Sequence, residues 1–268
     1  MKQIRSLGYI TISGEIEILS GLHIGDIADS IDREGIDHPV IKNPVTREPY
    51  IPGTYLRGRL RYQFEKKKRK LPGEMAPGIS KEISCGKDYP DSCLYAEESK
   101  VSRIFGNAQS DPEWSLILIV HDAHYTTQTR EDIINGRLPV TEAKMEILVD
   151  RFTAHAFPRT IERVPAGARF DFCIVYKVQT DDSGQFDSDK GNAALKQEIL
   201  DIIWALDEIE MHDCLGGNTS RGYGQVKFHK NTITVQNFTS EEPIELAIDF
   251  FKDYEINFSM PSNGGEHT

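Results

Sequence analysis

The chain has 268 residues, of which 38% are hydrophobic and 27% are charged, as expected for a globular protein of one large domain or two small ones. Because no apolar stretch approaches the ~20 residues that span a bilayer, and no continuous apolar segment opens the chain, we expect neither a membrane span nor a signal peptide. The net charge of −11 argues mildly against a nucleic-acid partner. Four cysteines without the spacing of a disulfide framework favour a reducing, cytoplasmic location.

The first quarter of the chain contains a predicted strand, a loop and a helix. Residues 8–19 alternate apolar and polar side chains, which predicts a half-buried strand. Residues 25–53 are rich in Gly, Asp and Pro and are typical of a long loop. A helix is predicted over 51–69, because Pro and Gly punctuate its start and apolar residues recur at helical spacing. Its segment Arg57–Lys70 holds eight basic residues and one acid, so the acidic chain contains one strongly basic segment.

The rest of the chain contains three further predicted strands, a second helix and two insertions. The insertions are an irregular one at about 71–101 and one with little periodicity at about 126–166. The strands are predicted over 113–125, 168–178 and 222–229, and the helix, which has one apolar face, over 192–213. The acidic residues 237–268 are expected to form an extension whose end is disordered.

This order of elements predicts an α+β fold with a ferredoxin-like (RRM-like) core. The sequence strand, helix, strand, strand, helix, strand is the order of that fold, with one four-stranded sheet backed by two helices. The core domain is expected to span 1–236, including both insertions. The aromatic signature of RNA-binding sheets is missing, so base stacking on the sheet is not expected.

The segment "LGGNTSRGYGQV", Leu215–Val226, is suited to binding an anion. Glycines let backbone N–H groups approach an anion closely, a serine hydroxyl can donate a hydrogen bond, and an arginine can bind a phosphate through two N–H groups. The residues concerned are Gly216, Gly217, Ser220, Arg221 and Gly222. Taken alone, the same segment is more typical of a tight turn between a helix and a strand.

Six segments in a fixed order carry a resemblance that extends from about residue 8 to residue 229. They are SGLHIG, GIDHPVIKNPVTREPYIPGTYLRGRLR, RIFGNA, TEAKMEILVDRFTAHA, IERVPAGARF and LGGNTSRGYG. With these segments the chain resembles the RAMP superfamily of CRISPR proteins, and within it the repeated Csm-type backbone subunit of type III effector complexes.

This resemblance implies a ferredoxin-like core that assembles with further copies of itself and with other type III subunits along a guide (CRISPR) RNA. It also implies a projecting thumb hairpin that interrupts the duplex between the guide and a complementary target RNA. An aspartate after the first strand would then support target cleavage with a divalent cation such as Mg²⁺ or Mn²⁺. The implied function is therefore an RNA-guided, metal-dependent endoribonuclease subunit.

Asp37 matches the catalytic aspartate of the family and is also the candidate metal ligand. Its carboxylate could hold a divalent cation or orient a ribose 2′-hydroxyl for attack on the adjacent phosphorus. Only the resemblance favours catalysis: by itself, an aspartate two residues before Pro39 is common as a residue that caps a turn. Asp32 and Glu34 lie nearby in sequence, and the sequence does not separate helpers of Asp37 from bystanders.

The resemblance also assigns contacts with RNA to residues outside the glycine-rich segment. They are His23, Arg57, Arg59, Arg61, Arg151 and Arg163. For His23, an ordinary role at the end of a strand is nearly as well supported. Tyr55 and Ala154 depart from the small residue and the glycine usual at their positions. Met145 and Ile147 could wedge against a base pair or simply pack within the hairpin.

Relatives often bind zinc in the insertion at 71–101, but here only Cys85 and Cys93 are present, and Ser102 stands where a cysteine is expected. Two thiols do not complete a tetrahedral site, so we do not expect structural zinc.

Three other functions remain open at this point. One is a scaffold subunit with an inert Asp37, which binds RNA without cutting it. Another is an enzyme of the same superfamily that processes repeat RNA without metal and uses a histidine as general base, for which His23 is the candidate. The last is a ferredoxin-like domain that binds a small molecule, which the acidic net charge allows.

Overall fold

The computed structural model describes residues 4–25, 38–69, 101, 104–105, 117–181, 188–238 and 255–259. The expectations for several other residues lie outside the described ranges: Asp32, Glu34, Asp37, Cys85, Cys93, Ser102, the insertion residues 71–100 and the C-terminal residues 261–268. In the described ranges, no helix is both long enough and apolar enough to cross a bilayer.

Seven strands of the described chain form the main sheet, in the order β2-β4-β7-β1-β8-β9, with β3 also paired to β7. Their bounds are β1 Ile4–Ile18, β2 Tyr50–Ile51, β3 Leu118–Val120, β4 Ala123–Tyr125, β7 Arg169–Asp181, β8 Val226–Asn237 and β9 Glu255–Ser259. Paired strands run antiparallel, except that β9 is parallel to β8. The fold therefore combines helices with antiparallel strands, as the sequence predicts. The sheet has seven strands instead of the predicted four, because one predicted strand is divided into β3 and β4, and β2 and β9 are added at the two edges.

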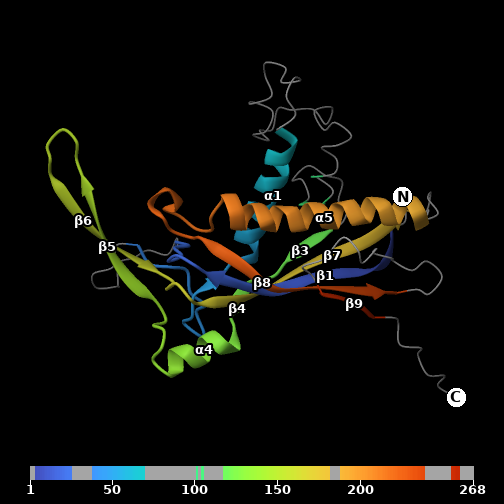
Figure 1. Ribbon diagram of the computed structural model, residues 1–268, viewed down its shortest axis with the longest axis horizontal. Coiled ribbons are helices and arrows are strands. Elements are labelled where there is room, and N and C mark those ends of the chain that lie inside the picture. Colours follow the sequence, from blue (N-terminus) through green and yellow to red (C-terminus); the bar gives the residue numbers. More distant parts are fainter. Residues whose placement is uncertain are drawn as a thin grey trace.

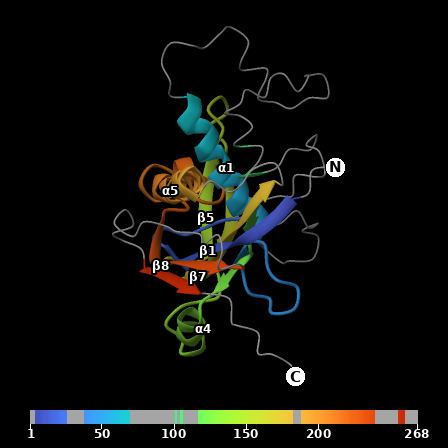
Figure 2. The same cartoon turned by 90° about the vertical axis from the view of Figure 1, so that its right-hand side faces the viewer.

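Two long helices cover one face of this sheet. Figures 1 and 2 show α1 (Gly53–Arg69) and α5 (Ser188–His212) above the sheet, and the short helix α4 (Thr127–Ile134) on its opposite side. The apolar stripe of α5 is at most 5% exposed and consists of Leu195, Ile199, Ile202, Leu206 and Ile209. Alternate residues of β1, among them Ile10, Ile12 and Ile16, are fully buried because they belong to the core between sheet and helices.

The strands β5 (Glu142–Val149) and β6 (Ala156–Arg163) pair as a separate two-stranded hairpin. Figure 1 shows this hairpin projecting from one end of the sheet. Residues 151–159, which form its tip, are all exposed. At the tip Ala154 has a φ of 55°, a left-handed conformation that favours glycine.

Several elements differ from the sequence-based expectation, among them the short strand β2, which lies in the segment predicted as a loop over 25–53. The strand predicted over 113–125 is divided into β3 and β4, because Asp122 leaves the ladder and its carboxylate accepts a hydrogen bond of 2.7 Å from the Gly53 N–H, at the start of α1. Helix α4 was missed because its eight residues carry little apolar periodicity, although Thr126 caps it by accepting from the Thr129 N–H at 3.1 Å. Strand β9 lies in the extension expected at 237–268 and pairs with β8 at one edge of the sheet.

Candidate nucleic-acid interface

Three segments that are distant in the sequence meet beside the hairpin: the chain after β1, the glycine loop (residues 215–224) and the base of the hairpin. The Gly217 N–H donates to the His23 carbonyl at 2.7 Å, and the Gly224 N–H donates to the Gly21 carbonyl at 3.1 Å. The backbone of Leu22 also pairs with Val164, just after β6. Backbone pairing thus brings three of the six quoted segments to one place.

Two glycines of this loop are required by its own packing. Gly216 has a φ of 81°, and a Cβ there would lie 2.4 Å from the His23 carbonyl oxygen. Gly224 has a φ of 76°, and a Cβ there would lie 1.7 Å from the Leu215 carbonyl oxygen. By contrast, a Cβ on Gly222 would meet no atom within 4 Å, although its φ is 80°. Close packing therefore requires glycine at Gly216 and Gly224. At Gly222 there is room for a side chain.

The outer turn of the loop presents polar groups to solvent. Residues Thr219–Arg221 form a short 3-10 helix, and Ser220, Arg221 and Gly222 are exposed, as is Gly217. The Arg221 guanidinium donates to the Asn218 side-chain oxygen at 2.9 Å through one nitrogen, and a guanidinium carries further N–H groups that can bind an anion. This turn can therefore offer a hydroxyl and a guanidinium to a phosphate.

His23 lies half-buried between the loop and the hairpin. Its Nδ1–H donates to the Glu162 carbonyl at 2.8 Å, which fixes the ring and leaves Nε2 as the second functional nitrogen. The contact supports a structural role for His23.

Helix α1 turns one set of side chains toward the glycine loop. The Tyr55 hydroxyl accepts a hydrogen bond of 2.5 Å from the Gly216 N–H, and burial raises the pKa of this hydroxyl, so it stays protonated. The Arg59 guanidinium donates to the Cys214 carbonyl at 2.8 Å and forms an ion pair with Asp213. Tyr55 therefore ties α1 to the loop.

The other two arginines of α1 have different partners. Arg57 donates to the Phe105 carbonyl, and Arg61 donates to Glu65 on the same helix at 2.9 Å. Burial, and secondarily the charge of Arg61, lowers the pKa of Arg57, which remains a cation at neutral pH. The structure therefore brings Arg59 to the residues that lead into the glycine loop, whereas these contacts of Arg57 and Arg61 are made elsewhere.

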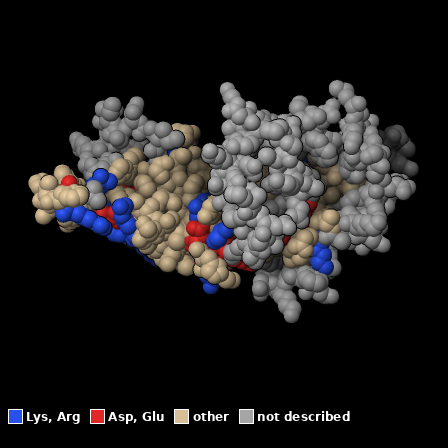
Figure 3. Space-filling model, turned by 90° about the horizontal axis from the view of Figure 1, so that it is seen from above, with Lys and Arg blue, Asp and Glu red and all other residues tan. Residues whose placement is uncertain are grey.

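The hairpin carries both cations and exposed apolar side chains. Arg163 forms an ion pair of 2.6 Å with Glu142 at the hairpin base, whereas Arg151 is exposed at the tip. Met145 is 70% and Ile147 65% exposed, so neither is packed against the rest of the described chain. Figure 3 shows Lys and Arg side chains gathered at this end of the molecule beside uncharged surface. This end therefore offers cations and apolar groups together.

Glu162, which the sequence did not single out, fixes the chain that follows Asp37. It is 3% exposed, and its carboxylate accepts hydrogen bonds from Lys42, from Thr141 at 2.7 Å and from the Val40 N–H at 3.0 Å. Burial alone would raise the pKa of Glu162, but these donors outweigh burial and lower it. The burial of Glu162 could not be predicted from the segment "IERVP", because a glutamate in a hairpin strand is ordinarily exposed.

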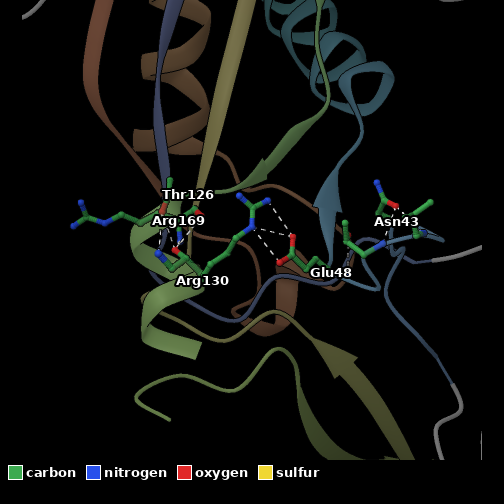
Figure 4. Close-up of polar contacts among 8 residues, drawn as sticks. Asn43, Glu48, Thr126, Arg130 and Arg169 are labelled. Carbon is green, nitrogen blue, oxygen red and sulfur yellow. Dashed lines mark hydrogen bonds and ion pairs between the residues drawn. The ribbon is translucent and has the colours of Figure 1, made fainter. Parts of the chain in front are cut away.

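A second polar cluster fixes the far end of the same segment (Figure 4). Arg130 on α4 binds the Glu48 carboxylate through two nitrogens, with Nε–Oε1 at 3.1 Å and Nη2–Oε2 at 3.0 Å. The Asn43 side chain caps the intervening turn by accepting from the Val45 N–H at 2.9 Å. Residues 38–48 are therefore held at both ends, by Glu162 and by Arg130.

The described residues contain no cluster of three or more His, Cys, Asp or Glu side chains arranged to bind a metal ion. A single aspartate remains compatible with a cation that is completed by phosphate oxygens, since Mg²⁺ is commonly bound by one or two carboxylates plus substrate phosphates.

Comparison with known proteins points to one family. The model of the RAMP superfamily matches residues 15–227. The CRISPR system Cms endoribonuclease Csm3 of Enterococcus italicus is 32% identical over 219 residues, covering 82% of this chain and 89% of the relative. The protein of the same name from Streptococcus thermophilus is 33% identical over 222 residues, covering 82% and 87%.

A solved structure agrees at the level of the fold. A chain of the type III-B Cmr-beta complex bound to cognate target RNA, determined by cryo-EM, superposes with a TM-score of 0.53 at 17% identity. The match covers 84% of this chain, which spans only 61% of that solved chain.

Proposed function

The chain belongs to the RAMP superfamily, and we propose that it is a guide-RNA-binding backbone subunit of a type III CRISPR ribonucleoprotein that cleaves complementary target RNA. Its partners would be guide and target RNA, further copies of itself and other type III subunits. Two observations support this proposal. The relatives are named as endoribonucleases, and the solved complex contains target RNA. A cytoplasmic location is part of the same proposal.

The observation that carries the proposal is the convergence of the glycine loop, the chain after β1 and the hairpin base. Exposed Ser220 and Arg221 lie on this loop, and the hairpin beside it carries Arg151, Met145 and Ile147 on exposed surface. Cations and backbone N–H groups suit an RNA backbone, and exposed apolar groups on a projecting hairpin suit contact with bases. Neither feature is needed by a domain that binds a small molecule.

We propose in addition that the core is ferredoxin-like. The chain order β1, α1, β3, β7, α5, β8 supports this, since it is the β-α-β-β-α-β order of that fold. The domain would span 1–236, with the β5–β6 hairpin as its thumb, followed by the acidic extension 237–268.

Within this proposal Asp37 supports cleavage of the target. It directly precedes His38, whose carbonyl accepts from the Glu162 N–H at 3.0 Å, so the chain on one side of Asp37 is fixed to the hairpin strand β6. Asp37 would hold a divalent cation, which when bound would stabilise negative charge on the phosphate. The same carboxylate could instead orient the ribose 2′-hydroxyl, and alignment of the RNA by the protein would supply much of the rate.

The substitution Asp37→Ala tests the proposal directly. With guide RNA bound, we expect target cleavage to fall at least about 100-fold, because a catalytic acid or base typically contributes that much. Guide binding should be retained, since the glycine loop is unchanged. The measurement is cleavage of a labelled complementary RNA by the assembled ribonucleoprotein, with binding of the guide measured separately.

Asp132→Asn is the matched control, because Asp132 pairs with Arg137 beyond the end of α4, and it should cleave like the unsubstituted protein. If the ribonucleoprotein with Asp37→Ala still cleaved the target fully, another group would do the cutting. This result would contradict a catalytic Asp37 and favour the scaffold function for this subunit. Cutting of free repeat RNA in the presence of EDTA would instead favour the processing enzyme.

A further inference from the structure

One tyrosine of the glycine loop is buried against the hairpin, and its side chain has no role in the RNA contacts described above. Tyr223 is 0% exposed, and its hydroxyl donates a hydrogen bond of 2.7 Å to the Glu146 carboxylate on β5. Burial, followed by the Glu146 hydrogen bond and charge, raises the pKa of Tyr223 to about 12. The hydroxyl therefore remains a donor throughout the physiological pH range.

Two cations of the hairpin lie against the ring of the same tyrosine. The Lys144 Nζ is 4.5 Å and the Arg163 guanidinium carbon 5.2 Å from the ring centroid, both within the range of cation–π attraction. Lys144 lies on β5 and Arg163 on β6, so the ring contacts both strands of the hairpin.

The contacts of Tyr223 are continuous with two ion pairs of the hairpin. Lys144 also pairs with Glu146 at 3.3 Å, and Arg163 pairs with Glu142 at 2.6 Å. Hydrogen bonding to the Tyr223 hydroxyl, the leading cause, lowers the pKa of Glu146, so this carboxylate is ionised at neutral pH. Five side chains therefore connect the loop to the hairpin base: Glu142, Lys144, Glu146, Arg163 and Tyr223.

We propose that Tyr223 is a positioning residue that couples the glycine loop to the hairpin, so that RNA held on the loop also fixes the orientation of the hairpin. The RNA part of this inference rests on the proposed function, whereas the mechanical coupling rests on the contacts alone. Among the described residues, the hairpin is also joined to the rest of the molecule by its two ends, by the backbone contacts of His38 and Leu22, and by the contacts of Glu162 with His23, Val40 and Lys42. None of these contacts involves a side chain of the glycine loop, whereas the Tyr223 ring does. A buried ring that touches both strands is therefore the main side-chain link between RNA-contacting loop and hairpin.

Amide hydrogen exchange of the full chain, without RNA, tests the coupling. Tyr223→Phe keeps the ring and removes the hydroxyl, and Tyr223→Leu removes both the hydroxyl and the cation–π contacts. We expect exchange in β5 and β6 at the hairpin base to rise about tenfold in Tyr223→Phe, the factor for loss of one hydrogen bond to a charged group, and further in Tyr223→Leu. Hairpin exchange that is unchanged in both variants would overturn the proposal.

The matched control is Tyr176→Phe. Tyr176 is also buried and its hydroxyl also donates to a glutamate, Glu198, but that contact joins β7 to α5. This variant should loosen its own surroundings and leave the hairpin unchanged. If it raises hairpin exchange as much as Tyr223→Phe, the effect is general destabilisation and the coupling is wrong.

In a second experiment, amide hydrogen exchange of the same proteins is measured after a single-stranded RNA oligonucleotide has been added. In the unsubstituted chain we expect RNA to slow exchange in both the loop and the hairpin base, and in Tyr223→Leu to slow it in the loop alone. Equal slowing of both segments in Tyr223→Leu would overturn the positioning role. If RNA slows neither segment of the unsubstituted chain, RNA binding at this loop is contradicted, while the RNA-free comparison still decides the coupling.

Discussion

Two basic regions of the molecule differ in what their charges do. Helix α1 has the densest run of cations in the sequence, yet Arg57, Arg59 and Arg61 each have a protein partner: a carbonyl, an aspartate and a glutamate. In the region of the glycine loop and hairpin, Arg151 and Arg221 are exposed. Among the described residues, the side chain of Arg221 donates a hydrogen bond to Asn218 alone. A run of charges in a sequence thus indicates how many cations are present, whereas the fold decides how many can meet a ligand.

The largest expected effect concerns the shape of the glycine loop, on which the second region depends. Gly224→Ala should lower the free energy of unfolding by about 3 kcal/mol, because its Cβ would overlap the Leu215 carbonyl and its backbone is left-handed. Gly222→Ala is the matched control, since it has nearly the same φ but open space, and should cost about 1 kcal/mol. Urea unfolding of both variants measures the difference. Equal losses would mean that close packing does not set the loop shape.

A smaller effect separates the cations of the two regions. Arg59→Met should lower the free energy of unfolding by about 2 kcal/mol, because it removes a charged hydrogen bond to Cys214 and leaves Asp213 without this partner. Arg221→Met should change it by less than about 0.5 kcal/mol, as is usual for an exposed side chain. Urea unfolding again gives both values. A large loss in Arg221→Met would show that this cation also serves the fold and would remove the contrast.

Periodicity predicted the elements that bury apolar stripes, because burial of one face leaves a regular pattern in the sequence. The stripe of α5 and the alternation of β1 are the clearest cases, and both are buried in the structure. The break between β3 and β4 was not predictable, because it depends on Asp122 capping a helix 69 residues earlier in the chain. Short α4 and strand β9 also left too weak a pattern.

For the candidate site, the sequence identified the glycine loop and the hairpin but not the contacts between them. Tyr223 and Glu162 are buried through partners on distant segments, and nothing local distinguishes them from an exposed tyrosine or glutamate. Conversely, the arginines of α1 were assigned alike from the sequence, although only Arg59 contacts the segment leading into the glycine loop. Roles that depend on long-range contacts therefore needed the structure, and the RNA contacts of all these residues stay predictions.

The most direct test of the central claim, that RNA lies on the glycine loop, is the salt dependence of RNA affinity for the unsubstituted chain and for Arg221→Met. We expect weaker binding by Arg221→Met and a log–log slope that is smaller by about 0.7, the value for one lost phosphate contact with single-stranded RNA. Arg137→Met removes the same charge beyond α4, where Arg137 pairs with Asp132, and should leave the slope unchanged. If a folded Arg221→Met variant kept the affinity and slope of the unsubstituted chain, RNA would not lie on this loop.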